Sequence, residues 1–230
     1  FSEDFFITIG HVPFYDSWAL IELDGKKILN ANDCILETPD RVQDIKNITD
    51  TVDILFTQFS YANWVEGGVS DSSSRASLAN EKLERIRMQA DVLKPSSIVP
   101  FASMVRFCHS ENSYMNDESN TPKQTVNFIE SNTKSKAFLM VPYENWNGES
   151  SKNNQTAVQF WEKAYENALK RPLIEPKKSF EFAEIKLAFN KMCSRVNKRN
   201  NKVLIYLLDA FGLLPNQIIK ITDLDCYVNF

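Results

Sequence analysis

The chain contains only two histidines, and each comes after an apolar run that predicts a buried strand. His11 directly follows the first such run, His109 comes shortly after a later one, and Asp33 stands at the end of a third. Neutral imidazoles and carboxylates are the ligands that hydrolytic zinc sites use. If the three strands end at one edge of a sheet, His11, Asp33 and His109 predict a metal site. The alternative is that both histidines are ordinary surface or core residues.

Two neighbouring side chains predict the outer ligand environment of this site. Asn32 directly precedes Asp33, and Glu111 stands two residues beyond His109. A carboxylate that accepts a hydrogen bond from a ligating imidazole fixes the orientation of the ring. We therefore expect Glu111 to orient His109.

A group of aromatic and amide side chains predicts the substrate-binding surface. Tyr61, Asn63 and Trp64 come just after the apolar run 52–58, where an α/β fold builds the wall of a pocket. Tyr114 lies in a polar loop and would form a rim or lid over the pocket. The alternatives are packing for Trp64 and a solvated loop around Tyr114.

The predicted elements alternate between strands and helices over the first 142 residues. The pair Asp24-Gly25 is a strong hairpin signal between two of the strands. Strands are expected at 5–9, 18–23, 27–30, 52–58, 97–102 and 137–141, and helices at 41–48, 75–93 and 125–130. This alternation predicts an α/β fold.

A segment rich in Asn, Gly and Ser at 145–154 predicts a boundary between two parts of the chain. We therefore expect one domain at 1–145 and a C-terminal α+β extension at 146–230. In the extension, helices are expected at 157–170 and 180–197, and strands at 203–209, 217–221 and 224–230.

Charge and composition exclude several classes of function. The net charge of −4 argues against a general nucleic-acid binder, which usually carries a basic face. No apolar run approaches the roughly 20 residues that span a bilayer. The four cysteines are widely separated, and the first residues lack the basic start of a signal peptide, so we expect reduced thiols and a cytoplasmic protein.

Three segments together resemble the metallo-β-lactamase superfamily. The turn Gly10-His11-Val12-Pro13 is similar to its Gly-His-Thr-Pro motif, and Asp33 follows His11 at a spacing normal for that superfamily. The segments 16–22, 28–34 and 100–112 resemble more narrowly the branch that contains UlaG-type lactonases and the hydrolase-like domain of CMP-N-acetylneuraminate hydroxylase. The resemblance covers roughly residues 5–142.

The resemblance implies the second half of an αββα sandwich and a metal-dependent hydrolase. It implies a divalent metal, zinc first, with iron or manganese as alternatives. A metal-activated water would attack an ester, a lactone or a phosphoester in a small-molecule substrate. The His-x-His-x-Asp-His motif of the superfamily does not occur in this sequence. Because the chain also starts without methionine, we expect an incomplete sequence, and an enzyme only if the missing part carries that motif.

Two other interpretations of the same resemblance remain. The first is a non-catalytic module with this fold that has lost its metal site and binds a partner protein through the pocket or residues 157–230. The second is a domain that serves an oxygenase-like system, which would need a Rieske iron–sulfur domain elsewhere.

Overall fold

A computed structural model describes residues 5–12, 16–32, 34–65, 69–146, 153–175, 180–213, 218–221 and 226–229. The chain divides into two compact units, Phe1–Ile174 and Glu175–Phe230, each of which is described by itself.

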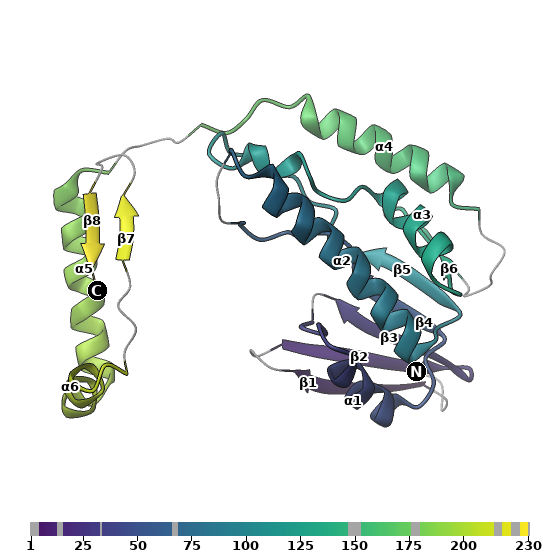
Figure 1. Ribbon diagram of the computed structural model, residues 1–230, viewed down its shortest axis with the longest axis horizontal. Coiled ribbons are helices and arrows are strands. Elements are labelled where there is room, and N and C mark those ends of the chain that lie inside the picture. Colours follow the sequence, from purple (N-terminus) through teal and green to yellow (C-terminus); the bar gives the residue numbers. More distant parts are fainter. Residues whose placement is uncertain are drawn as a thin grey trace. The chain divides into compact units, whose positions relative to one another are not determined.

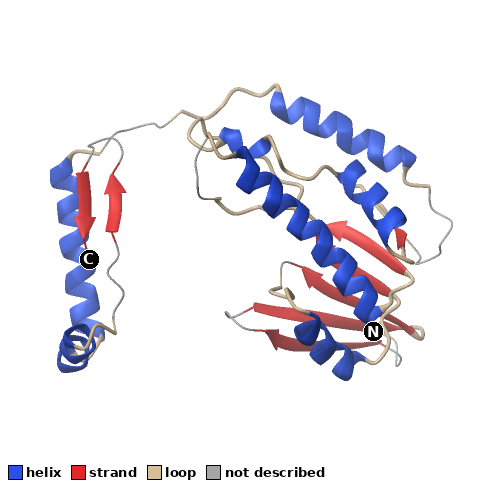
Figure 2. Ribbon diagram, viewed as in Figure 1, coloured by secondary structure: helices blue, strands red, loops and turns tan. Residues whose placement is uncertain are grey.

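The first unit contains a six-stranded mixed sheet (Figures 1 and 2). The strands lie in sequence order, namely β1 (Phe5–Val12), β2 (Asp16–Leu23), β3 (Lys26–Asn32), β4 (Ile54–Gln58), β5 (Ser97–Phe101) and β6 (Lys136–Ala137). Strands β1 to β3 are antiparallel, whereas β3 to β6 are parallel. Asp24 and Gly25 both have positive φ, 50° and 73°, which confirms the predicted hairpin turn between β2 and β3.

Helices connect the parallel strands, as the sequence predicts. They are α1 (Pro39–Thr49) between β3 and β4, α2 (Ser72–Leu93) between β4 and β5, and α3 (Pro122–Asn132) between β5 and β6. A short 3-10 helix, η1 (Ser113–Asn116), precedes α3, and α4 (Gln155–Leu169) follows β6. The starts of α1 and α3 have a clear local cause. Thr38 and Thr121 accept hydrogen bonds from first-turn N–H groups, and a proline follows each of them.

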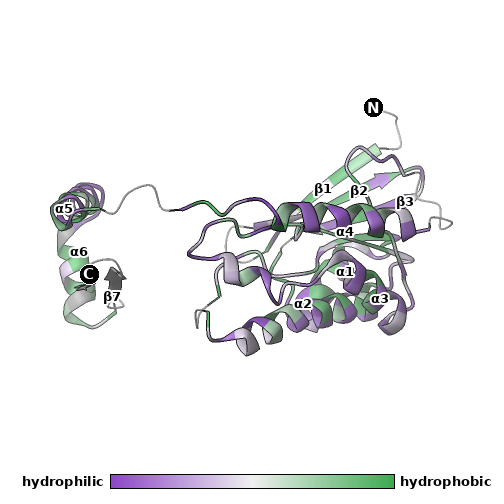
Figure 3. Cartoon of the chain, turned by 90° about the horizontal axis from the view of Figure 1, so that it is seen from above, coloured by the Kyte–Doolittle hydropathy of each residue, from purple (hydrophilic) through white to green (hydrophobic). Residues whose placement is uncertain are grey.

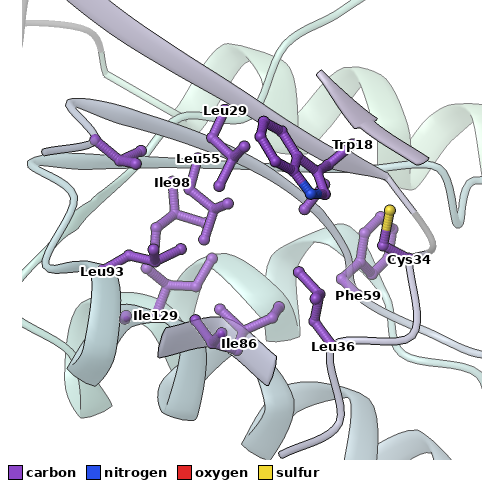
Figure 4. Close-up of a cluster of buried hydrophobic side chains, with 14 of the residues drawn as sticks. Trp18, Leu29, Cys34, Leu36, Leu55, Phe59, Ile86, Leu93, Ile98 and Ile129 are labelled. Atoms are coloured by element: carbon purple, nitrogen blue, oxygen red, sulfur yellow. The ribbon is translucent and has the colours of Figure 1, made fainter. Parts of the chain in front are cut away.

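The three connecting helices pack on the same face of the sheet. The pairing register aligns Leu20, Leu29, Leu55 and Ile98 in one row across four strands. These side chains are buried in a single cluster that contains residues of α1, α2 and α3, such as Ile86 (Figure 4). Burying each large aliphatic side chain contributes about 1.5–3 kcal/mol to folding, so this layer is the main source of stability.

The second unit combines two helices with a β-hairpin. The helices are α5 (Phe182–Arg199) and α6 (Lys202–Ala210), and the antiparallel strands are β7 (Ile218–Ile221) and β8 (Cys226–Asn229). The predicted strand at 203–209 is wrong, because this segment is α6. The side chain of Asn201 accepts hydrogen bonds from the backbone N–H groups of Val203 and Leu204, at 3.0 and 3.3 Å. This bonding is typical of a helix N-cap.

The fold class expected from the sequence is confirmed. The first unit is α/β, and the second unit is a C-terminal α+β extension. The structure divides the chain after Ile174 rather than after residue 145, because α4 packs on the first unit through Ala157. None of the helices in the described ranges is both long and apolar enough to span a membrane.

Candidate functional site

One edge of the sheet collects the ends of the strands that carry the predicted ligands. His11 pairs with Ser17, which places it where β1 ends and β2 begins. Asn32 ends β3, the next strand after β2. His11 and Asn32 are therefore two strand spacings apart, about 10 Å. Asp33 itself lies outside the described residues, and its predecessor Asn32 lies at the same edge as His11.

The backbone turns sharply at the end of β3. The register between β3 and β4 shifts between Asn30 and Asn32, and Asn32 has a φ of 44°. Its N–H group donates to the side-chain oxygen of Asn30 at 3.0 Å. A little further on, the buried Cys34 thiol donates to the carbonyl of Ser17 at 3.2 Å. A bulge of this kind changes the direction of a strand end, often beside a functional site.

Glycine at position 10 allows β1 to lie close to β2 next to His11. Gly10 pairs with Trp18, and a Cβ at this position would collide with the Trp18 ring. Trp18 is buried in the core, whereas His11 is exposed. His11 also borders a small cavity of about 110 Å³ together with Trp18 and Arg41 of α1. The imidazole is thus accessible at the rim of a well-packed region.

His109 lies in the long connection between β5 and α3. It is exposed, and its backbone N–H group donates to the side-chain oxygen of Asn112 at 3.2 Å. Two backbone hydrogen bonds tie this segment to Ile174, from Ile174 to Cys108 at 2.8 Å and from Ser110 to Ile174 at 3.1 Å. In the part of the chain that is described, no hydrogen bond joins the exposed carboxylate of Glu111 to the His109 imidazole.

The two histidines belong to different parts of the sheet edge. His11 is the penultimate residue of β1, and His109 comes eight residues after the end of β5 at Phe101. Strands β1 and β5 are four spacings apart, about 19 Å. Within the described ranges, no group of three or more His, Cys, Asp or Glu side chains is arranged to hold a metal ion. A metal centre here therefore requires Asp33 together with donors from outside these ranges.

A buried polar network fixes the loops that follow β4 and β5. The Ser103 hydroxyl accepts hydrogen bonds from the N–H groups of Phe59 and Ser60, at 3.1 and 3.0 Å. Asn120, just before α3, donates to the Phe59 carbonyl at 2.8 Å and also contacts Ser60. Because these groups satisfy one another away from water, they hold the loops rigidly at the carboxyl edge of the sheet.

Tyr61 and Tyr114, both expected to contact substrate, lie in one cluster beside these loops. Tyr61 is buried, and its hydroxyl donates to the carbonyl of Met115 at 2.7 Å. Burial raises the pKa of Tyr61 to about 12. The Arg75 guanidinium lies 5.0 Å from the centre of the Tyr114 ring. Both rings thus shape the loop around η1.

Asn63 and Trp64 stand outside this cluster. Both side chains are exposed, Trp64 by 61%, and Asn63 contacts only the backbone of its neighbour among the described residues. A large aromatic ring this exposed is available to a ligand. The structure therefore separates the four predicted substrate contacts into two packed tyrosines and two exposed side chains.

The buried arginine of this region is a feature that the helical pattern of the sequence does not reveal. Arg75 lies on α2, and its side chain is 1% exposed. It forms a two-point ion pair with Asp117, with distances of 2.9 and 2.6 Å. The hydrogen bonds from Arg75 hold the pKa of Asp117 below its usual value. Only the fold brings the two residues together across 42 positions.

Comparisons with known proteins leave the family open. No family model matches the chain, and no curated protein matches it. Among solved structures, the chain is similar to a mutant of CmlA beta-hydroxylase, with 12% sequence identity and a TM-score of 0.38. The match covers 59% of this chain and 29% of that chain. A likeness at this level carries no argument about family or activity.

Proposed function

We propose that this chain is the later half of a metal-dependent hydrolase of the metallo-β-lactamase superfamily. One observation carries the proposal, namely that His11 and Asn32, the residue before Asp33, lie at one edge of the sheet, two strand spacings apart. In mixed α/β sheets this edge is where binding sites form. The chain supplies an accessible imidazole at this edge, and Asp33 would supply the carboxylate.

His11, Asp33 and His109 would hold a divalent ion, zinc first, with further ligands from the superfamily's His-x-His-x-Asp-His motif. A bound ion of this kind lowers the pKa of water towards about 7 and so supplies a nucleophile for an ester, lactone or phosphoester. The exposed Trp64 and Asn63 would contact the substrate, while Tyr61 and Tyr114 keep the loop around η1 in place.

The metal content of the protein from its natural source, purified without chelators, tests this proposal. We expect about one to two equivalents of zinc, iron or manganese. In the same full-length protein, H11A and D33N should each remove most of the metal and most of the hydrolytic activity. T8A on the same exposed strand and D91N on the exposed surface of α2 serve as matched controls.

The controls separate ligation from general damage to the fold. T8A and D91N should retain metal and activity, and circular dichroism should show all four variants folded. Full metal occupancy in both H11A and D33N would contradict the proposal. The chain would then be better explained as a non-catalytic module that shares the fold.

A further inference from the structure

A cavity of about 480 Å³ lies between α4 and the segment that joins β5 to α3. This volume falls within the range of small-molecule sites. Helix α4 lines it with Val158, Trp161, Tyr165 and Leu169, at spacings of three and four residues. These residues share one side of the helix, so α4 presents an apolar, largely aromatic wall to the cavity. The Trp161 indole N–H donates to the Met140 carbonyl at 2.8 Å, which helps to fix the position of α4.

Arg106 supplies a polar group on the opposite wall. Its Nη2 donates to the Arg171 carbonyl at 2.8 Å, just beyond the end of α4. This bond holds one end of the guanidinium in place. The Nε atom is buried and has no hydrogen-bond partner among the described residues. Because Nε is closed to solvent, a ligand in the cavity would pair with the outer nitrogens of the guanidinium.

Within the described part of the chain, the ion pairs around the cavity leave Arg106 as the cation that can pair with a ligand. Lys123 is paired with Glu162 at 3.0 Å, and Asp117 is paired with Arg75 at 2.6 Å. Among the described residues that line the cavity, Arg106 is therefore the cation without an ion-pair partner. Glu166 also lines the cavity, on the exposed side of α4. One guanidinium beside this carboxylate favours a monoanion over a phosphate dianion.

A second donor comes from Tyr165. Within the described ranges, its hydroxyl has no hydrogen-bond partner. Burial raises the pKa of Tyr165 to about 12, so the hydroxyl stays protonated at every physiological pH. It can therefore donate a hydrogen bond to an anion. The start of α3 is a poorer donor, because Thr121 and Gln124 already satisfy its first N–H groups with a capping box.

We propose that this cavity binds an aromatic monocarboxylate of the arylacetate kind, with the ring against Trp161 and Tyr165 and the carboxylate hydrogen-bonded to Arg106. The aromatic wall selects a flat apolar body, and the single guanidinium selects a single carboxylate. None of these residues belongs to the candidate metal site, so the binding is independent of any metal.

Isothermal titration calorimetry with three ligands of nearly equal shape tests the charge requirement. The ligands are indole-3-acetate, the neutral indole-3-acetamide and the cationic tryptamine. We expect the carboxylate to bind at least about tenfold more tightly than the other two. The affinity should be unchanged after treatment with a chelator, which distinguishes this site from the metal-dependent function proposed above.

Variants assign the binding to the cavity. R106Q should weaken the binding of indole-3-acetate by about ten- to a hundredfold, and Y165F by a smaller factor. A168W should block binding, because Ala168 lines the cavity and an indole there would fill it. K163A, at an exposed position on α4 outside the lining, is the matched control. Thermal melts would verify that each variant is folded.

Three outcomes would overturn the proposal. One is equal affinity for indole-3-acetate and indole-3-acetamide, which would show that the guanidinium does not select the ligand. Another is unchanged affinity in folded R106Q and A168W, which would place the binding elsewhere. The third is no detectable binding of indole-3-acetate at millimolar concentrations.

Discussion

Arg75 determines the position of the loop around η1 through three contacts. Its guanidinium forms the two-point ion pair with Asp117, lies on the Tyr114 ring and donates to the Val69 carbonyl at 3.3 Å. A planar guanidinium can do all of this at once, whereas an ammonium cannot reproduce the fork geometry. Arg75 therefore helps to hold the loop that carries the predicted substrate contact Tyr114, together with the Tyr61 hydroxyl that donates to Met115.

This ion pair predicts a specific dependence of stability on pH. The pKa of Asp117 is lowered by the hydrogen bonds from Arg75. A carboxylate with a lowered pKa in the folded state contributes stability above its unfolded pKa of about 3.9. That contribution is lost as the pH falls further, through the folded pKa. D117N should lower Tm by about 2–6 °C at pH 7, because the guanidinium loses its charged partner.

Thermal melts of the wild type and D117N between pH 7 and pH 3 would measure this effect. The gap between the two Tm values should narrow below about pH 4, where the Asp117 carboxylate becomes protonated in the unfolded chain before it does so in the folded protein. E111Q, at an exposed position in the same loop, is a matched control and should melt like the wild type. A gap that stays constant down to pH 3 would contradict the role of the Asp117 charge.

At the scale of elements, the packing of β1 on β2 depends on the close approach of Gly10 to the Trp18 ring. In the sequence, only the glycine indicates this contact. β1 is an edge strand without charged residues, and Figure 3 colours it largely as hydrophobic. Val12 of this strand is buried in the core, and Gly10 lies directly against Trp18, which is 2% exposed. The position of His11, one residue further on, follows from this close approach.

G10A should therefore displace the Trp18 ring or the end of β1. Overpacking of this kind lowers the free energy of unfolding by about 1–3 kcal/mol. T8A, on the same strand at an exposed position, should change it by no more than about 0.5 kcal/mol. Urea denaturation followed by tryptophan fluorescence would measure both. Equal stability of G10A and the wild type would show that the ring has room for a methyl group.

The sequence predicted elements well where local chemistry decides them. The hairpin at Asp24 depends on turn residues that can be identified in sequence, whereas α1 and α3 begin at Pro39 and Pro122, before the expected residues 41 and 125, because Thr38 and Thr121 cap them. The strand prediction for 203–209 was wrong because an uninterrupted apolar run shows neither the period of a helix nor that of a strand. The Asn201 cap was the local signal that favoured a helix.

For the candidate sites, local sequence patterns predict which residues follow strands but not which residues pack together in three dimensions. The sequence predicts that His11 and Asp33 come where two strands end, and the structure shows that the ends of β1 and β3 lie at one edge of the sheet. It does not predict that Arg106 faces Trp161 across a cavity, since those residues are brought together only by the packing of α4. Burial of Arg75 is likewise a product of tertiary contacts.

At the scale of the whole molecule, the boundary between the two units can be tested by shortening the chain. The composition at 145–154 predicts that a stable first domain ends near residue 145, whereas the structure keeps residues up to Ile174 with the first unit. The difference lies in the contacts of α4 and its flanks. The Asn154 side chain accepts a hydrogen bond from Leu139 at 2.8 Å and donates to the Ala137 carbonyl at 2.7 Å.

A chain that ends at residue 174 should melt cooperatively at nearly the Tm of the first unit in the full chain. A chain that ends at residue 145 loses the Asn154 and Trp161 hydrogen bonds and the burial of Ala157. These losses should lower the free energy of unfolding by about 3–5 kcal/mol. Circular dichroism melts of both chains beside the full chain would decide between the two boundaries. Equal Tm values for the two shortened chains would favour residue 145, and would mean that α4 contributes only the wall of the cavity and not the stability of the sheet.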